Sequence, residues 1–439
     1  MTADESISAR KTAWKQRFLD HFGLLLFLAA AAVVVLRIPA LMSEPRLWAE
    51  EGGRYYAVAY RYAHGPQWPL GLLNVQRGYF ALWPNLASTI AANLASIEDA
   101  PYVTTWMALL AQLLPLAIIT WGQADIWKAP WKRVGGVLVY LLIPISGEIW
   151  LNTINSQFYF ALAAVLVMLE PIGLTRAHRW ALRLALAVAG LTGPVTAMIA
   201  PLFVVIAVMT RNRERVTQAA VLVGCALLQA GLLVAFSASD KSIGIRVAEV
   251  KAPVLAFVAW TQSIGLLLFG WEPMANLAHW VAATYGGGEV DVAVFGIVLA
   301  LVAAALVIWL AADLPREQRV TLMGSYLLLF TLSYLGGLAP DKLNLLPPGN
   351  GGRYFWVPNV LLGFMFLANL SARRRTGFKT LMCAGLLSLS LANGAILFSK
   401  TIPFSADWPV WRAEIALWRS DPAHRIKIWP AGWEMVLTR

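Results

Sequence analysis

Long apolar stretches dominate the chain, and short polar segments separate them. Most of the stretches are close to the roughly 20 residues that a helix needs to cross the hydrocarbon core of a bilayer. The pattern predicts an all-α polytopic membrane protein with roughly ten to twelve transmembrane helices. The apolar runs cover residues 22–42, 78–96, 103–122, 134–149, 157–173, 182–210, 216–236, 253–270, 291–312, 320–339, 354–370 and 380–398.

Composition leads to the same class of protein. Of the 439 residues, 59% are hydrophobic and 13% are charged. A soluble protein of this length would carry about a quarter of charged residues, so this chain cannot form an ordinary water-facing surface. The net charge of +11 does not indicate nucleic-acid binding, because basic residues in a membrane protein mark its cytoplasmic loops.

Basic clusters border the apolar runs and predict their orientation. If all the clusters are cytoplasmic, three segments lie outside the membrane, at residues 43–77, 146–157 and 340–353. These segments are where chemistry would meet water. The basic clusters lie at residues 10–17, 128–133, 176–183, 211–215, 316–319 and 373–379.

This orientation divides the chain into three parts. Residues 1–21 form a cytoplasmic segment, residues 22–398 form a transmembrane domain with outer loops, and residues 399–439 form an outer tail rich in tryptophan. The tail predicts a short amphipathic helix that lies at the level of the lipid headgroups. Its apolar positions recur with helical spacing at Trp411, Ile415 and Trp418.

Three runs depart from simple alternation. Strict alternation would place two basic clusters outside, a conflict that disappears if the runs at 78–96 and 253–270 lie along the outer interface or re-enter. The run at 182–210 has basic residues at both ends and is too short for two full spans with a turn. It predicts either a re-entrant pair of short helices that break at 191–194 (Leu-Thr-Gly-Pro) or one tilted helix with a proline kink.

The first outer segment carries two adjacent carboxylates, Glu50 and Glu51, among aromatic residues. On an interfacial helix these carboxylates would meet the headgroup of a lipid-linked reactant. The alternative is structural. Glu50 and Arg54 are four residues apart, which suits an exposed helical ion pair worth about a few tenths of a kcal/mol, while Glu51 faces solvent.

The second outer segment concentrates polar side chains between two apolar runs. Glu148, Asn152, Asn155 and Gln157 offer one charge and several amide donors and acceptors. Amides of this kind suit the hydroxyl groups of a sugar. The alternative is that they form ordinary helix ends and turns, where asparagine is common.

The third outer segment brings Lys342 and Arg353 to the outer side, against the general preference of basic residues for the cytoplasm. Arg353 stands at the entrance of an apolar run and follows glycines that allow close approach of the backbone. Its guanidinium group offers fixed donors for a pair of phosphate oxygens, with Lys342 as a second cation. The alternative is that Arg353 reaches the lipid headgroups instead.

Other reaction classes lack their motifs. The chain contains no His-Glu-x-x-His and no Gly-x-Ser-x-Gly sequence, and its five histidines are scattered. The sequence therefore excludes the metalloprotease and serine hydrolase classes in their usual form.

Three features together resemble the C-type (GT-C) glycosyltransferase superfamily of bacterial envelope enzymes. They are a first span followed by an outer interfacial helix, the sequence Trp-x-Glu-Glu-Gly at 48–52, and an outer loop that ends in Gly-Gly-Arg-Tyr at 351–354. The resemblance implies a GT-C-like fold with a catalytic base in the first outer loop. It also implies polyprenyl-phosphate sugar donors that are used on the periplasmic face. The chain departs from the family's Asp-Asp or Asp-Glu pair by having Glu-Glu.

Carried onto this chain, the resemblance implies Glu50 or Glu51 as the catalytic base and Arg353 as a contact to the donor phosphate. One carboxylate is sufficient, because a phosphate leaving group needs no acid to protonate it. The predicted substrate-binding set comprises Arg54, Glu148, Asn152, Asn155, Gln157, Lys342, Arg353 and Tyr354.

The predicted protein is a multi-pass glycosyltransferase of the bacterial inner membrane, with a cytoplasmic N-terminus. It moves a sugar, with inversion, from a polyprenyl-phosphate donor to an envelope glycan or lipid acceptor on the periplasmic face. Its expected partners are the donor, the acceptor and membrane lipids, without nucleic acid. We expect no required cofactor, and a divalent metal stays open. Two alternatives also stay open: a non-catalytic translocator of polyprenyl-linked lipids or polysaccharides, and an O-antigen-type polymerase or ligase.

Overall fold

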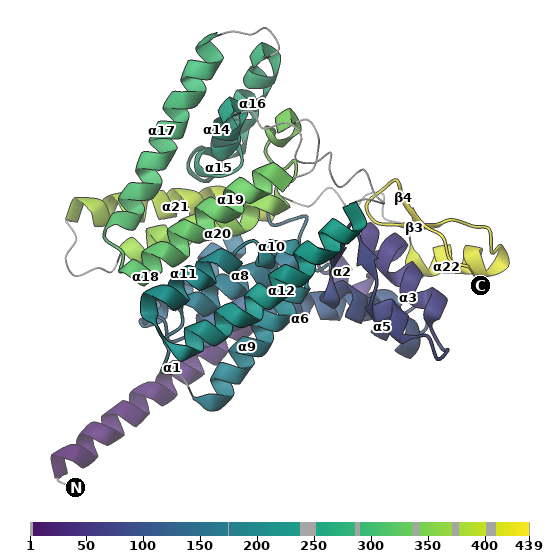
Figure 1. Ribbon diagram of the computed structural model, residues 1–439, viewed down its shortest axis with the longest axis horizontal. Helices are drawn as coiled ribbons and strands as arrows, with labels where there is room; N and C mark the ends of the chain where they lie inside the picture. Colours follow the sequence, from purple (N-terminus) through teal and green to yellow (C-terminus); the bar gives the residue numbers. More distant parts are fainter. Residues whose placement is uncertain are drawn as a thin grey trace.

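The computed structural model describes residues 3–173, 175–237, 252–285, 290–336, 342–370, 377–400 and 410–438. The regular structure of this part of the chain is almost entirely helical (Figure 1). Four of its helices are long and apolar enough to cross a membrane, which agrees with an α-helical membrane protein. The predicted ten to twelve crossings and the GT-C-like fold stay predictions. The four helices are α6 (Ala100–Trp121), α12 (Arg213–Ser237), α17 (Val290–Ala312) and α21 (Gly377–Ser399).

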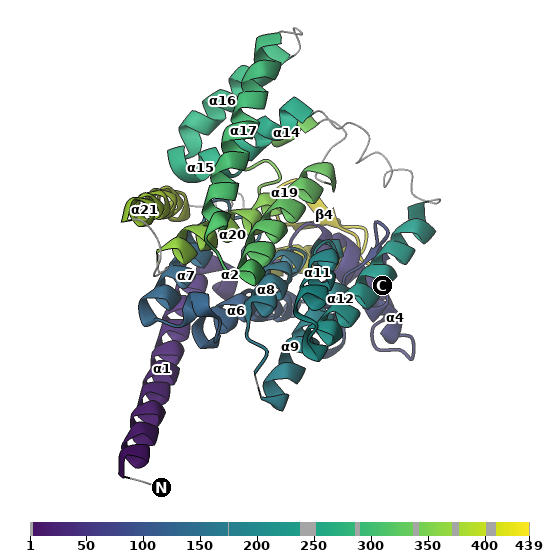
Figure 2. The same ribbon diagram turned by 60° about the vertical axis from the view of Figure 1, so that its left-hand side comes forward.

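Shorter apolar helices form the interior of the helical bundle. Helices α8 (Ser156–Leu169) and α20 (Arg353–Asn369) are buried along almost their whole length, because they are apolar on every side. Both lie in the middle of the bundle (Figures 1 and 2). The first helix starts far outside the bundle and enters it with its apolar half (Figure 1). The other bundle helices are α1 (Ala3–Leu36), α7 (Pro130–Leu142), α9 (Arg176–Leu191), α11 (Ala200–Thr210) and α19 (Ser325–Gly336).

The run at 182–210 breaks where the sequence predicts a break. Helix α9 ends at Leu191, Gly193 adopts a φ of +88°, and the one-turn helix α10 (Pro194–Ala197) leads into α11. The chain then turns back, since Arg183 of α9 lies 2.5 Å from Glu214 at the start of α12. One continuous kinked helix is therefore wrong, because a positive φ followed by proline cannot continue the helix. The placement of this pair in a bilayer stays a prediction.

The two runs predicted not to cross form short elements. In the first of them, the hairpin of β1 (Val75–Gln76) and β2 (Tyr79–Phe80) precedes α5 (Leu82–Leu94), whose 13 residues are too few to span a bilayer. In the second, the chain breaks at residues 262–263 between two helices. That region comprises α14 (Ala252–Thr261), α15 (Ile264–Phe269) and α16 (Trp271–Tyr285).

A layer of short elements covers one end of the bundle (Figure 1, right). The predicted helix of the tail is present, but its apolar face packs against protein: Trp411, Ile415 and Trp418 are buried against Leu47 and Tyr56. This face is therefore not left for lipid, because residues far apart in sequence cover it. The layer comprises α2 (Ala40–Ser43), η1 (Glu51–Tyr56), α3 (Ala57–Tyr62), α4 (Pro69–Leu72), α22 (Trp411–Ser420), β3 (Ile426–Ile428) and β4 (Trp433–Met435).

Described residues of four basic clusters lie at the other end of the bundle. Lys379 lies 2.7 Å from Asp313 at the end of α17, and residues of three further clusters line a single cavity. A common cytoplasmic side requires this arrangement. Which side of a membrane this end faces stays a prediction. Short elements at this end are η2 (Asp125–Trp127), α18 (Arg316–Arg319) and η3 (Val320–Gly324), whereas η4 (Lys342–Leu345) precedes α20.

Candidate functional site

The turn that carries Glu50 is held by the C-terminal part of the chain. Ala49 has a φ of +41°, and its backbone N–H donates to the carbonyl of Trp429, whose own N–H donates to Leu47. Gly52 lies so close to Ile428 that an added Cβ would stand 2.8 Å from its side chain. The tail therefore fixes the entry into η1, so that the two glutamates point in different directions.

Glu50 faces a hairpin turn. A guanidinium nitrogen of Arg77 lies 3.5 Å from the Glu50 carboxylate, and both side chains are partly exposed. Arg77 and Gly78 have φ values of +50° and +78°, which is the backbone of a two-residue turn that matches the twist of a β-hairpin. The hairpin thereby carries a cation to a carboxylate that precedes it by 27 positions.

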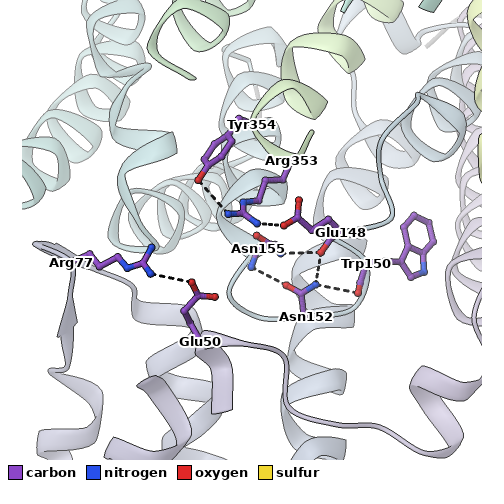
Figure 3. A network of polar contacts seen from close by, with 8 residues as sticks. All are labelled: Glu50, Arg77, Glu148, Trp150, Asn152, Asn155, Arg353 and Tyr354. Carbon is purple, nitrogen blue, oxygen red and sulfur yellow. Dashed lines mark hydrogen bonds and ion pairs between the residues drawn. The ribbon is translucent and has the colours of Figure 1, made fainter. Parts of the chain in front are cut away.

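The segment at 146–157 is a compact turn that its own amides hold together (Figure 3). The side-chain amide nitrogens of Asn152 and Asn155 donate to the Glu148 carbonyl at 2.8 Å and 3.0 Å. The Asn152 side-chain oxygen accepts from the backbone N–H of Asn155 at 3.1 Å. Both asparagines are almost fully buried. These amides therefore brace a turn, as the structural alternative predicts, and they hold the Glu148 side chain in place.

Arg353 stands at the first residue of α20 and forms an ion pair with Glu148 (Figure 3). A second nitrogen of its guanidinium group lies 3.4 Å from the Tyr354 hydroxyl, and the group lies 5.0 Å from the centre of the Tyr354 ring. Residues 205 positions apart thus meet. The pair leaves Arg353 with further N–H donors, since a guanidinium group has five.

These residues surround one pocket, with a cavity of about 60 Å³. One carboxylate, three guanidinium groups, three amides and three phenol rings line it, so the lining carries a surplus of positive charge. The side-chain carbonyl oxygen of Gln157 is buried and accepts no hydrogen bond within the described residues. The lining residues of this Glu50 pocket are Glu50, Arg54, Tyr55, Gln76, Arg77, Tyr79, Ile154, Asn155, Gln157, Arg353 and Tyr354.

Glu51 does not line the pocket. Its carboxylate is 2% exposed and accepts from the backbone N–H of Trp48 at 2.9 Å, from the N–H of Thr153 at 3.0 Å, and from the Thr153 hydroxyl. Burial raises the pKa of Glu51, and these hydrogen bonds oppose the rise. The side chain ties η1 to the turn at 146–157, and hence it positions Glu50 without reaching the pocket.

Lys342 also lies away from the pocket. Its side chain is 1% exposed, and its ammonium group donates to the Leu335 carbonyl at 2.9 Å. Of the predicted residues, Glu50, Arg54, Asn155, Gln157, Arg353 and Tyr354 line the pocket, whereas Glu148 and Asn152 support it from behind.

Sequence reasoning missed several residues of the pocket. Arg77 was the easiest of them to predict, because it is a cation next to glycine in a predicted outer segment, where basic residues are uncommon. The apolar and aromatic lining carries no such signal. The missed residues are Tyr55, Gln76, Arg77, Tyr79 and Ile154.

No metal centre is found in the part of the chain that the structure describes, where no three His, Cys, Asp or Glu side chains gather into a group able to hold an ion. The pocket itself offers the single carboxylate of Glu50 among its lining residues. Comparison with protein-family models, with curated proteins and with solved structures found no match.

Proposed function

We propose that the chain is an integral membrane glycosyltransferase of the GT-C type, which uses a polyprenyl-phosphate-linked sugar as its donor and works on the periplasmic face of a bacterial inner membrane. The acceptor is an envelope glycan or lipid. One observation carries the proposal: a single carboxylate, Glu50, shares a pocket with Arg54, Arg77 and Arg353, although these residues come from two distant outer segments. A phosphate leaving group and a hydroxyl nucleophile require this combination of charges.

Glu50 acts as the general base in this proposal. It takes the proton of the acceptor hydroxyl, whose oxygen attacks the anomeric carbon of the sugar while the bond to the donor phosphate breaks. Attack opposite the leaving group inverts the anomeric centre. The phosphate leaves as a weak base, so that no second carboxylic acid is needed, and this agrees with the single carboxylate of the pocket.

The arginines stabilise the charge that develops on the departing phosphate. Arg353 offers N–H donors beyond its pair with Glu148, and a guanidinium nitrogen of Arg77 lies 3.5 Å from the Glu50 carboxylate. Donors placed in advance around a developing negative charge are worth a few kcal/mol in the barrier. Removing one of them is expected to slow the reaction more than it weakens donor binding.

The size of the pocket suggests how the donor is arranged. A cavity of about 60 Å³ holds a few water molecules or one phosphate group, but not a whole sugar. In this proposal the phosphate therefore binds on the arginine side of the pocket and the sugar extends from its mouth, so that Glu50 meets the acceptor hydroxyl on the side of the anomeric carbon opposite the phosphate.

The decisive experiment compares two carboxylates in sugar transfer. The purified full-length protein is reconstituted in vesicles with a radiolabelled polyprenyl-phosphate sugar, and transfer to envelope acceptors is measured. Glu50→Gln should lower the transfer rate by about 10² to 10⁴-fold, the usual contribution of a general base, and should retain donor binding. Glu44→Gln is the matched control, because Glu44 is a carboxylate of the same segment whose side chain is 71% exposed.

Full transfer by Glu50→Gln would contradict the proposal. If that variant moved the lipid-linked donor across the vesicle membrane at the normal rate, the protein would be a translocator instead. The orientation is tested separately with Arg61→Cys, at an exposed position in the same predicted outer segment as Glu50. An impermeant thiol reagent should label this variant from the periplasmic side, since both native cysteines are buried. Labelling only from the cytoplasm would remove the assignment.

A further inference from the structure

A second, larger cavity lies at the opposite end of α8. The Glu50 pocket includes Gln157 at the start of this helix, and the second cavity includes Met168 and Glu170 at its end. A helix rises 1.5 Å per residue, so the two sites are separated by about 20 Å. The cavity volume is about 710 Å³, which falls within the range of roughly 300 to 1,000 Å³ that is typical of ligand sites. We call it the Glu170 cavity.

Charged side chains line this cavity from several elements. Its cations are Lys128, Arg133, Arg215 and Arg316, and its acids are Asp125, Glu170 and Glu317. Two of the cations use most of their N–H donors in hydrogen bonds within the protein. Arg133 donates to three backbone carbonyls, and Arg215 donates to the carbonyls of Val167 and Glu170 at 3.2 Å and 2.7 Å.

Arg215 nevertheless keeps one buried donor without an acceptor. The residue is 4% exposed, and its Nε–H finds no hydrogen-bond partner among the described residues. A buried donor of a charged group without an acceptor is costly, and native structures rarely leave one unless an ion or another molecule satisfies it. This nitrogen has almost no accessible surface, so Arg215 lines the cavity with other atoms and contributes its positive charge to the site.

Arg316 adds an uncommitted charge at the mouth of the cavity. Its side chain is exposed and forms no ion pair within the described part of the chain. Lys128 is paired with Asp125, but its side chain is still 69% exposed. Glu170 uses its carboxylate to accept from the backbone N–H groups of Gln123 and Ala124, and burial raises its pKa. The hydrogen-bond donors that remain available to a ligand therefore belong to the cations of the lining.

We infer that the Glu170 cavity binds a phosphate-bearing anion, with the Arg316 guanidinium group as its donor, the positive charge of Arg215 in the same lining and Lys128 at the entrance. Arginine suits phosphate oxygens, because its N–H groups form charge-assisted hydrogen bonds in a fixed geometry. Leu19, Met168 and Ile172 line the same cavity, which also suits the first carbons of a lipid chain. The phosphate of a lipid headgroup and free phosphate share this chemistry. The inference does not depend on the proposed function.

A footprint on Lys128 tests the inference in the full-length protein in detergent. An amine-reactive reagent labels exposed lysines, and peptide mass spectrometry measures the labelling rate of Lys128. Dioctanoyl phosphatidic acid should lower that rate about tenfold at saturation, whereas dioctanoylglycerol, which lacks the phosphate, should not. Lys427 is the internal control, because it is exposed on β3 at the other end of the molecule. Inorganic phosphate is titrated in parallel to separate a headgroup from a free anion.

Two variants of opposite sign decide the role of the charges. Arg316→Gln should raise the half-protection concentration about tenfold, the loss expected for one charge-assisted contact. Glu317→Gln should lower it, because the variant removes a negative charge from the lining. Arg176→Gln removes an exposed cation that does not line the cavity, and it should leave protection unchanged.

The inference would be overturned if neither phosphate compound protected Lys128, or if Arg316→Gln behaved as wild type does. Protection by phosphatidic acid alone would assign a lipid headgroup, and equal protection by inorganic phosphate would assign a free anion. Loss of transfer in the Glu50→Gln variant tests the proposed function separately, since that residue lies at the far end of α8.

Discussion

The Glu50 pocket and the Glu170 cavity contain the same types of side chain, but they use them differently. Around the Glu170 cavity, Arg133 donates to three backbone carbonyls and Glu170 accepts from two backbone N–H groups. In the Glu50 pocket, Arg77 and Arg353 contact carboxylates of other side chains. Charges that bond to the backbone hold helix ends in place, whereas charges that face only each other can exchange a partner for a substrate. The hydrogen-bond partner, and not the residue type, therefore separates structural from functional charges.

The largest effect is expected for Glu51. It lies beside the Glu50 pocket, but its carboxylate accepts from backbone N–H groups, as that of Glu170 does in the cavity. Glu51→Ala removes the acceptor of three buried donors, so the free energy of unfolding should fall by about 3 kcal/mol or more. Glu50→Ala should change it by less than about 1 kcal/mol. Thermal unfolding in detergent measures both. Equal destabilisation by the two variants would contradict the distinction between structural and functional charges.

A smaller effect is expected for the arginines. Arg133→Gln leaves buried carbonyls without their donor, and it should lower the free energy of unfolding by about 2 kcal/mol. Arg77→Gln should lower it by less than about 0.5 kcal/mol, because the Arg77 side chain is 37% exposed and its ion pair is loose. The same unfolding measurement ranks the pair, and a reversed order would contradict the comparison.

The Glu148–Arg353 pair offers an intermediate case. Both side chains are partly exposed, at 29% and 21%, so a double-mutant cycle of Glu148→Gln and Arg353→Gln should show a coupling energy of about 1 kcal/mol. A coupling of about 3 kcal/mol would instead mark the pair as a buried structural bridge. Arg353 would then be less free to contact a phosphate.

The smallest effect is a dependence of stability on pH. Burial raises the pKa of Glu51 above 4.5, so the folded protein holds this proton more tightly than the unfolded chain does. The resulting stability is complete below about pH 4.5 and is lost as pH rises through the pKa of the folded state. The melting-temperature advantage of wild type over Glu51→Gln should therefore shrink as the pH rises above about 4.5. A melting-temperature advantage that grows with pH would mean that folding lowers the pKa of Glu51 instead of raising it.

Local signals predicted the larger features of the fold. The break after Leu191 was predictable, because glycine followed by proline interrupts a helix wherever it occurs. The helix that carries Trp411, Ile415 and Trp418 was predictable from its spacing, but the surface that it covers was not. A periodic apolar face shows that a helix will bury that face, without showing whether lipid or protein will cover it.

The candidate site was predictable in part. Charge bias selected the three segments that carry the candidate residues, and six of the predicted residues line one pocket. Lys342 is the counterexample, because the fold buries it against the carbonyl of Leu335. Arg77 was missed, since its position beside Glu50 depends on a hairpin whose turn sequence, Arg-Gly, is not among the common signals.

The sequence by itself determined that the chain is apolar, helical and divided by basic clusters, because hydropathy and charge bias act on each segment independently of the others. Only the tertiary structure decided which of two neighbouring glutamates faces the pocket. The Glu51 carboxylate accepts a hydrogen bond from Thr153, 102 positions away, whereas the Glu50 carboxylate faces Arg77. Adjacent carboxylates have the same local chemistry, so contacts between distant segments are what separate them.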